Sequence, residues 1–216
     1  MANNQRRRQK KLEKKKAKRK AAKVRFIKTV SGLSLGRDII IAAKSPVHEG
    51  LVSDGLSELG IGNVVLAKKM PGNNIGVGVF LLDTFCLGVK DVFYATLSPE
   101  QYATKIQQLR SSEPFDTIHP ACARKLIEGG VLYAKQWGFE PHRDYKVVMR
   151  IFGDIDPVVC PTKFEYGRDG KPFYVSGPND TSKKSRAILD TLMKRCGPDG
   201  FDYMVEMGEW HEHEQE

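Results

Sequence analysis

The chain has 216 residues, 40% of them hydrophobic and 28% charged, which is typical of one globular domain with at most an appendage. A membrane span is excluded, because the longest apolar stretch, Ile75 to Val89, is too short and contains Asp83. A small disulfide-dependent domain is also excluded, because the chain is long and has only four cysteines.

The net charge of +9 is unevenly distributed along the chain. Residues 1–28 contain 14 basic residues and one acid, a net charge of +13. Residues 29–205 contain 21 basic and 20 acidic residues, and residues 206–216 contain five glutamates. The sequence therefore predicts a basic arm (1–28), a nearly neutral globular domain (29–205) and an acidic C-terminal tail (206–216).

The arm is predicted to be disordered. Residues 5–25 are good helix formers, but repeated like charges at i and i+4 oppose a helix in free solution. Leu12 and Val24 are the only sizeable apolar residues in this stretch, so it lacks the apolar stripe of a membrane-binding helix. Its charged start is not followed by a secretory signal, and we expect a cytoplasmic protein.

The first helices and strands of the domain have only weak sequence signals. An apolar run, residues 39–43, ends at the break formed by Ser45 and Pro46. Residues 48–60 space three leucines loosely as a short helix. We therefore expect one short helix before the first strand.

Strands follow in residues 63–97. The runs 63–70 and 75–83 flank the turn PGNN and predict a hairpin, and 85–97 predicts a neighbouring strand. Gly76 and Gly78 leave one strand face nearly bare, so a helix should pack closely against it.

Helices dominate the second half of the chain. Ser98, Pro99 and Gln101 form a capping box that starts a helix, and further helices are expected over the ranges 120–137, 144–152 and 182–195. Residues 163–177 predict a second hairpin with its turn at 168–171. This order predicts an α+β fold, in which antiparallel β-hairpins pack against helices in a single domain.

The four cysteines are expected to be small buried apolar residues. None forms a close C-x₂₋₄-C pair of the kind that binds zinc. Cys160, which precedes Pro161, is the one candidate for a reactive thiol.

Three stretches together resemble a family of uncharacterised bacterial proteins: GVFLLDTFCLGVKDVFY (78–94), YAKQWGFEPHRDYK (133–146) and FEYGRDGKPFYVSGPND (164–180). In that family a D-x-x-C-L-G-V-K-D strand precedes a G-F-x-P-H-x-D helix end. The resemblance covers about residues 45–195 and implies one compact domain, but no activity, cofactor or catalytic residue.

The arm predicts binding to nucleic acid. It is similar to the basic extensions of ribosomal and other RNA-associated proteins, in which lysine and arginine displace counterions from phosphate. That analogy favours RNA over DNA, and a merely solubilising tail is the other interpretation. The residues expected to contact phosphate are Arg6, Arg7, Arg8, Lys10, Lys11, Lys14, Lys15, Lys16, Lys18, Arg19, Lys20, Lys23 and Arg25.

Aromatic residues of the second hairpin could add base stacking. Phe164, Tyr166, Phe173 and Tyr174 lie there among basic residues, as in a platform for single-stranded nucleic acid. Packing in the core is the better interpretation, because hairpin aromatics usually fill the interface between sheet and helix.

A metal-dependent hydrolase or nuclease, with the arm as substrate anchor, is the alternative function. Asp83, Asp91 and His142 are its candidate catalytic residues, and Asp154 and Asp156 could together bind a divalent metal ion. No other cofactor is predicted, since neither of the glycine-rich segments, 32–36 and 76–78, has the pattern of a nucleotide-binding loop. A non-catalytic subunit that binds an acidic protein is a third interpretation, and the sequence leaves open the oligomeric state and whether the protein is an enzyme.

Overall fold

The computed structural model describes residues 35–177 and 180–205, which form a single α+β domain. A five-stranded antiparallel sheet has the order β4-β3-β2-β1-β5. Its strands are β1 (Val47–Ser53), β2 (Ile61–Met70), β3 (Asn74–Asp83), β4 (Gly88–Leu97) and β5 (Phe115–Thr117). The predicted fold class is confirmed.

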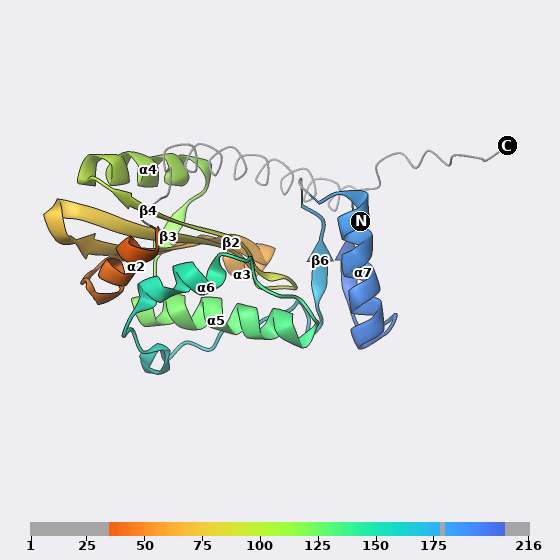
Figure 1. The fold of residues 1–216 in the computed structure, drawn as a ribbon. Helices are drawn as coiled ribbons and strands as arrows, with labels where there is room; N and C mark the ends of the chain where they lie inside the picture. Colours follow the sequence, from red (N-terminus) through yellow and green to blue (C-terminus); the bar gives the residue numbers. More distant parts are fainter. Residues whose placement is uncertain (1–34, 178–179, 206–216) are drawn as a thin grey trace.

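Helices cover both faces of this sheet (Figure 1). One face carries α4 (Pro99–Ser112). The other face packs against α2 (Leu35–Lys44), α5 (Pro120–Gln136), α6 (Tyr145–Val148) and the 3-10 helix η2 (Met149–Phe152). None of the described helices combines the length and apolar character needed to cross a membrane.

The remaining elements are short, except for the last helix. The one-turn helix α3 (Leu56–Leu59) precedes β2, η1 (Pro71–Asn73) joins β2 to β3, and η3 (Pro157–Val159) follows η2. Helix α7 (Ser182–Cys196) lies beside a two-stranded parallel sheet of β6 (Phe173–Val175) and β7 (Asp202–Met204) (Figure 1).

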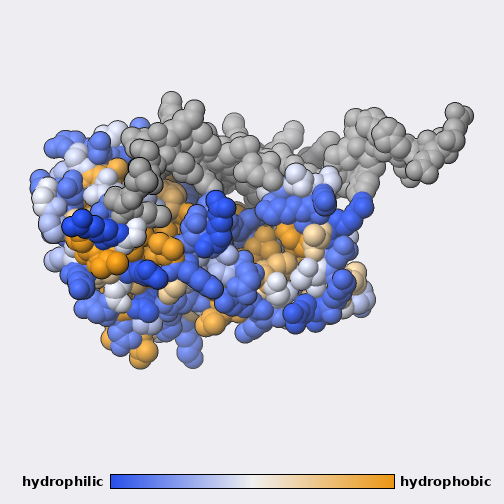
Figure 2. Space-filling model, in the orientation of Figure 1, coloured by the Kyte–Doolittle hydropathy of each residue, from blue (hydrophilic) through white to orange (hydrophobic). Residues whose placement is uncertain are grey.

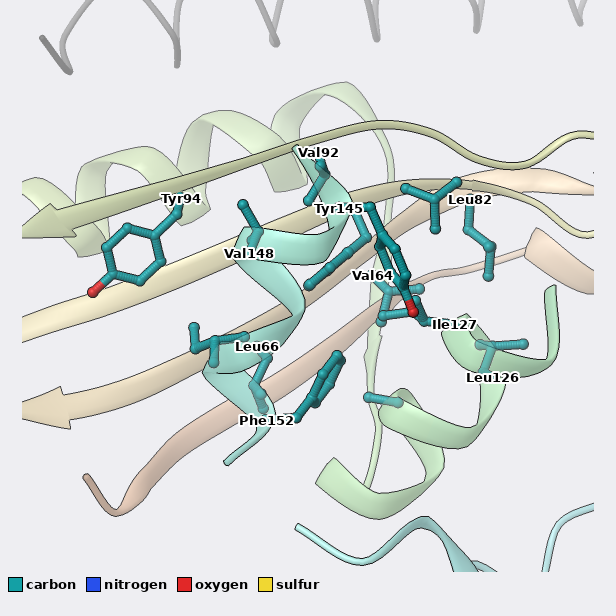
Figure 3. Close-up of a cluster of buried hydrophobic side chains, with 14 of the residues drawn as sticks. Val64, Leu66, Leu82, Val92, Tyr94, Leu126, Ile127, Tyr145, Val148 and Phe152 are labelled. Carbon is teal, nitrogen blue, oxygen red and sulfur yellow. The ribbon is translucent and has the colours of Figure 1, made fainter. Parts of the chain in front are cut away.

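Alternation along the strands builds two cores. Val64 and Leu66 of β2 face α5 and α6, whereas Val65 and Ala67 face α4. Figure 3 shows sheet residues meeting side chains of α5, α6 and η2 in the first of these cores. Because both faces of the sheet are covered, the inner strand β3 is apolar at nearly every position.

Several sequence predictions are confirmed in detail. The Ser98 hydroxyl accepts from the Gln101 N–H at 3.3 Å, and the Gln101 side chain accepts from the Ser98 N–H at 3.0 Å. A Cβ at Gly76 would lie 3.1 Å from Ala42 of α2, and one at Gly78 would lie 3.3 Å from Ile151 of η2. The glycine-bare face of β3 is thus covered by helices.

Two predicted elements are wrong. Residues 48–60 are not one helix, because the first half forms β1, in which Leu51 pairs with Val65 and is buried by the sheet. Residues 163–177 are not a hairpin. The turn at Asp169 and Gly170 forms with positive φ at both positions, but β6 beyond it pairs with β7 instead.

The four cysteines were predicted to be small buried apolar residues, with Cys160 as a candidate reactive thiol, but two of them are covalently joined. Cys122, in the first turn of α5, forms a disulfide with Cys160. Cys86 and Cys196 are free, and Cys86 is fully buried. The disulfide fixes the segment after η3 to α5, so Cys160 is not a free thiol in this structure.

Candidate functional site

The structure brings His142 and Asp91 together at the outer edge of the main sheet. Helix α5 ends before Gly138, and the following loop returns along β4, where the His142 N–H donates to the Val89 carbonyl at 2.9 Å. The His142 Nε2 lies 3.9 Å from Asp91 Oδ1, and its Nδ1 lies 3.7 Å from Asp144 Oδ2. The imidazole is therefore flanked by two carboxylates.

The hydrogen bonds of the ring define its chemistry. The Nδ1 of His142 accepts from the Asp144 N–H at 3.3 Å, so the lone pair that a general base would use is engaged by the backbone. The opposite nitrogen faces the Asp91 carboxylate. This arrangement orients the ring and fixes the loop to β4.

Asp83 stabilises the turn between β3 and β4. It ends β3, and its carboxylate accepts from the N–H groups of Phe85 and Cys86 at 3.1 and 2.9 Å, which closes the turn into β4. Burial raises the pKa of Asp83, and the nearby Lys90 and the backbone N–H groups oppose this shift. The side chain is thus committed to the turn.

Asp154 and Asp156 are engaged separately. The Asp156 carboxylate accepts from the Val158 N–H at 2.9 Å and caps η3. Asp154 acts on the buried Lys68 of β2: burial lowers the pKa of Lys68, and the charge of Asp154 partly restores it. Within residues 35–177 and 180–205, no three His, Cys, Asp or Glu side chains are grouped to hold a metal ion.

A buried polar network that the sequence did not reveal joins β4 to α7. Lys90 is the extra residue of a β-bulge, because Leu81 pairs with Asp91 while Leu82 pairs with Val89. Its Nζ lies 3.5 Å from an oxygen of Asp180, whose side chain is only 3% exposed.

Asp180 is the centre of this network. Its carboxylate accepts from the Gly177 N–H at 2.7 Å and the Tyr174 hydroxyl at 3.3 Å, and it pairs with Lys184 at 2.9 Å. Burial acts to raise the pKa of Asp180, but Lys90, Lys184 and the Gly177 N–H together hold it below its usual value. The network therefore holds an ionised carboxylate at the junction between the sheet and α7.

The outer surface of α7 is basic. Its exposed charged residues are Lys183, Lys184, Arg186, Asp190, Lys194 and Arg195. Two lysines lie in the first turn, where the helix dipole disfavours positive charge, and no acid accompanies them there. Figure 2 shows mostly hydrophilic residues around a small apolar patch on the visible side of the β6 and α7 region. The basic residues predicted for the arm lie outside the described residues.

Comparison of the chain with protein-family models, curated proteins and solved structures found no match.

Proposed function

We propose that the protein binds nucleic acid, with RNA favoured over DNA by analogy, through the basic arm (1–28). The observation that carries the proposal is the net charge of +13 in these 28 residues. A densely basic segment binds phosphate by releasing condensed counterions, and this contribution to affinity is independent of base sequence.

The domain supports the proposal through α7, which adds five basic residues and one acid to the surface. This helix concentrates basic residues in a domain whose net charge over residues 29–205 is only +1. We therefore expect the arm to supply most of the affinity and α7 to extend the phosphate contacts onto the domain.

Aromatic base stacking has no part in this proposal. Tyr174 is fully buried, Tyr166 stacks on Tyr133 with ring centroids 6.0 Å apart, and the Arg168 guanidinium lies 4.6 Å from the Phe173 ring centre. Phe164 packs against the core. These rings serve the fold, as the sequence favoured, so binding should show little base preference.

The test is titration of the full chain, and of a variant lacking residues 1–25, with a generic single-stranded RNA over a salt series. With about 6–10 phosphates contacted, the full chain should lose about 10³–10⁵ in affinity between about 50 and 200 mM salt. The truncated variant should bind far more weakly and with a shallower slope. If truncation changes neither affinity nor slope, the proposal fails.

A length-matched control separates charge from chain length. In this variant the arm keeps all its residues, but its lysines and arginines are replaced by glutamine. A second variant with the arm sequence scrambled should bind as the wild type does, because the contacts depend on charge density and not on order.

The hydrolase alternative is favoured by one contact, between His142 and Asp91 at 3.9 Å, but the other candidate residues are engaged by the backbone. Asp83 closes a turn, Asp156 caps η3, and the His142 Nδ1 is engaged by a backbone N–H. The third interpretation, binding of an acidic protein, predicts that pull-downs survive nuclease treatment.

A further inference from the structure

The exposed basic side chains of α7 form a surface, here called the α7 face, which also carries the acid Asp190: its cations are Lys183, Lys184, Arg186, Lys194 and Arg195. Lys184 pairs with Asp180 at 2.9 Å. Lys183, Lys194 and Arg195 are exposed and form no ion pair with any residue in 35–177 or 180–205. A surface with these three cations is complementary in charge to an acidic segment.

The described chain ends beside α7, and the residues that follow it are acidic. Phe201 and Val205, on either side of β7, pack in the same cluster as Ile188 and Leu192 of α7. The acidic tail (206–216) therefore starts at the flank of this helix. Its five acids are Glu206, Glu209, Glu212, Glu214 and Glu216.

We infer that the acidic tail docks on the α7 face and competes there with polyanions. The reach is sufficient: the 15 residues of α7 span about 22 Å, whereas eleven extended residues span about 36 Å. Because the tail is tethered beside the helix, its effective local concentration is on the order of millimolar, which favours weak charge pairing.

The docking also offsets an unfavourable feature of α7. Lys183 opposes the helix dipole in the first turn, whereas Lys184 is already paired with Asp180, and glutamates near that end would offset the charge of Lys183. A nucleic acid of higher charge density would displace the tail and take over the same lysines. The docking does not itself depend on nucleic-acid binding.

Zero-length carbodiimide cross-linking of the full chain tests the contact directly. The reagent joins a Glu carboxylate to a Lys amine with loss of water only when the two are in contact, and mass spectrometry locates the bond. We expect links from the tail to Lys183, Lys184 and Lys194, at least about tenfold above links to the exposed Lys163, and their loss at about 1 M salt.

Two outcomes overturn the inference. One is tail links mainly to lysines of the basic arm, or no excess over Lys163. The other is links that join different molecules, which a mixture of ¹⁴N- and ¹⁵N-labelled protein reveals.

Affinity for a short oligouridine gives a second readout. Replacing the five tail glutamates by glutamine should raise affinity about tenfold at low salt, whereas replacement by aspartate should leave it unchanged. The gain should vanish when Lys183, Lys194 and Arg195 are also replaced by glutamine. If the gain persists, the tail docks elsewhere. If no variant binds oligouridine while the cross-links form, the proposed function fails and the docking stands.

Discussion

Replacement of Asp180 by alanine tests whether the buried network fixes α7 to the sheet. The carboxylate is 3% exposed and contacts Lys90, the Gly177 N–H and the Tyr174 hydroxyl. Removing one partner of a fully buried ion pair costs about 3–5 kcal/mol. Since Lys90 is 12% exposed, water recovers part of its hydration. We therefore expect the free energy of unfolding to fall by about 2–4 kcal/mol.

A double-mutant cycle in urea unfolding isolates the pair. The substitution Lys90→Met should lower the free energy of unfolding less in Asp180→Asn protein than in the wild type. The difference, which is the coupling energy, should be about 1–2 kcal/mol. Lys184→Met is the matched control: this lysine is 57% exposed, so its loss should cost only about 0–1 kcal/mol. A coupling of zero would refute the reasoning.

The same pair predicts the pH dependence of stability. The charges and hydrogen bonds around Asp180 outweigh burial and lower its pKa in the folded state. Such an acid stabilises the folded state at pH values above its pKa in the unfolded state, which is about 3.9. This stabilisation is lost as the pH falls through the pKa of the folded state. The difference in stability between wild type and Asp180→Asn should therefore shrink between about pH 7 and about pH 3, and a constant difference would contradict the assignment.

Three further perturbations can be measured by unfolding. Burial raises the pKa of Asp83, so ionisation of this carboxyl destabilises the folded wild type as the pH rises. The stability of Asp83→Asn relative to the wild type should therefore increase from about pH 4 to about pH 8, and a difference that does not change with pH would contradict this. Gly76→Ala would place a Cβ 2.6 Å from the Tyr94 hydroxyl and should cost about 1–3 kcal/mol, whereas Gly78→Ala, with its nearest contact at 3.3 Å, should cost less than about 1 kcal/mol. Reducing the Cys122–Cys160 disulfide, which spans 38 residues, should cost about 4 kcal/mol, and Cys122→Ala/Cys160→Ala protein should not respond to the reductant.

The elements that the sequence predicted correctly have signals of their own. The hairpin of β2 and β3 has its turn residues, α4 has the Ser98 capping box, and α5 begins at Pro120. Strand β1 has no such signal, because His48 and Gly50 interrupt its apolar pattern. Its conformation depends on pairing with β2, which a local pattern does not contain.

The second hairpin shows how a correct turn can mislead. Asp169 and Gly170 adopt the turn that a D-G pair favours, with φ of 51° and 78°. The segment before the turn is held instead by α5, since the Tyr166 hydroxyl donates to the Leu126 carbonyl at 3.0 Å. Because that segment contacts α5, it does not pair with β6, and β6 pairs in parallel with β7 instead. Turn chemistry therefore fixed the bend and left the strand partner undetermined.

The network around Asp180 shows why part of the site was beyond local inference. Lys90 follows an apolar run, and a cation that is buried there needs a counter-charge, since an unpaired one would be costly. Alternation alone would give Lys90 and Asp91 opposite faces and leave one of them in the core. The bulge resolves the conflict by adding a residue, which allows Lys90 to reach Asp180 while Val89 and Val92 stay buried. A buried Lys90 thus needs an acid, but only the fold selects which of the 20 acids in residues 29–205 meets it.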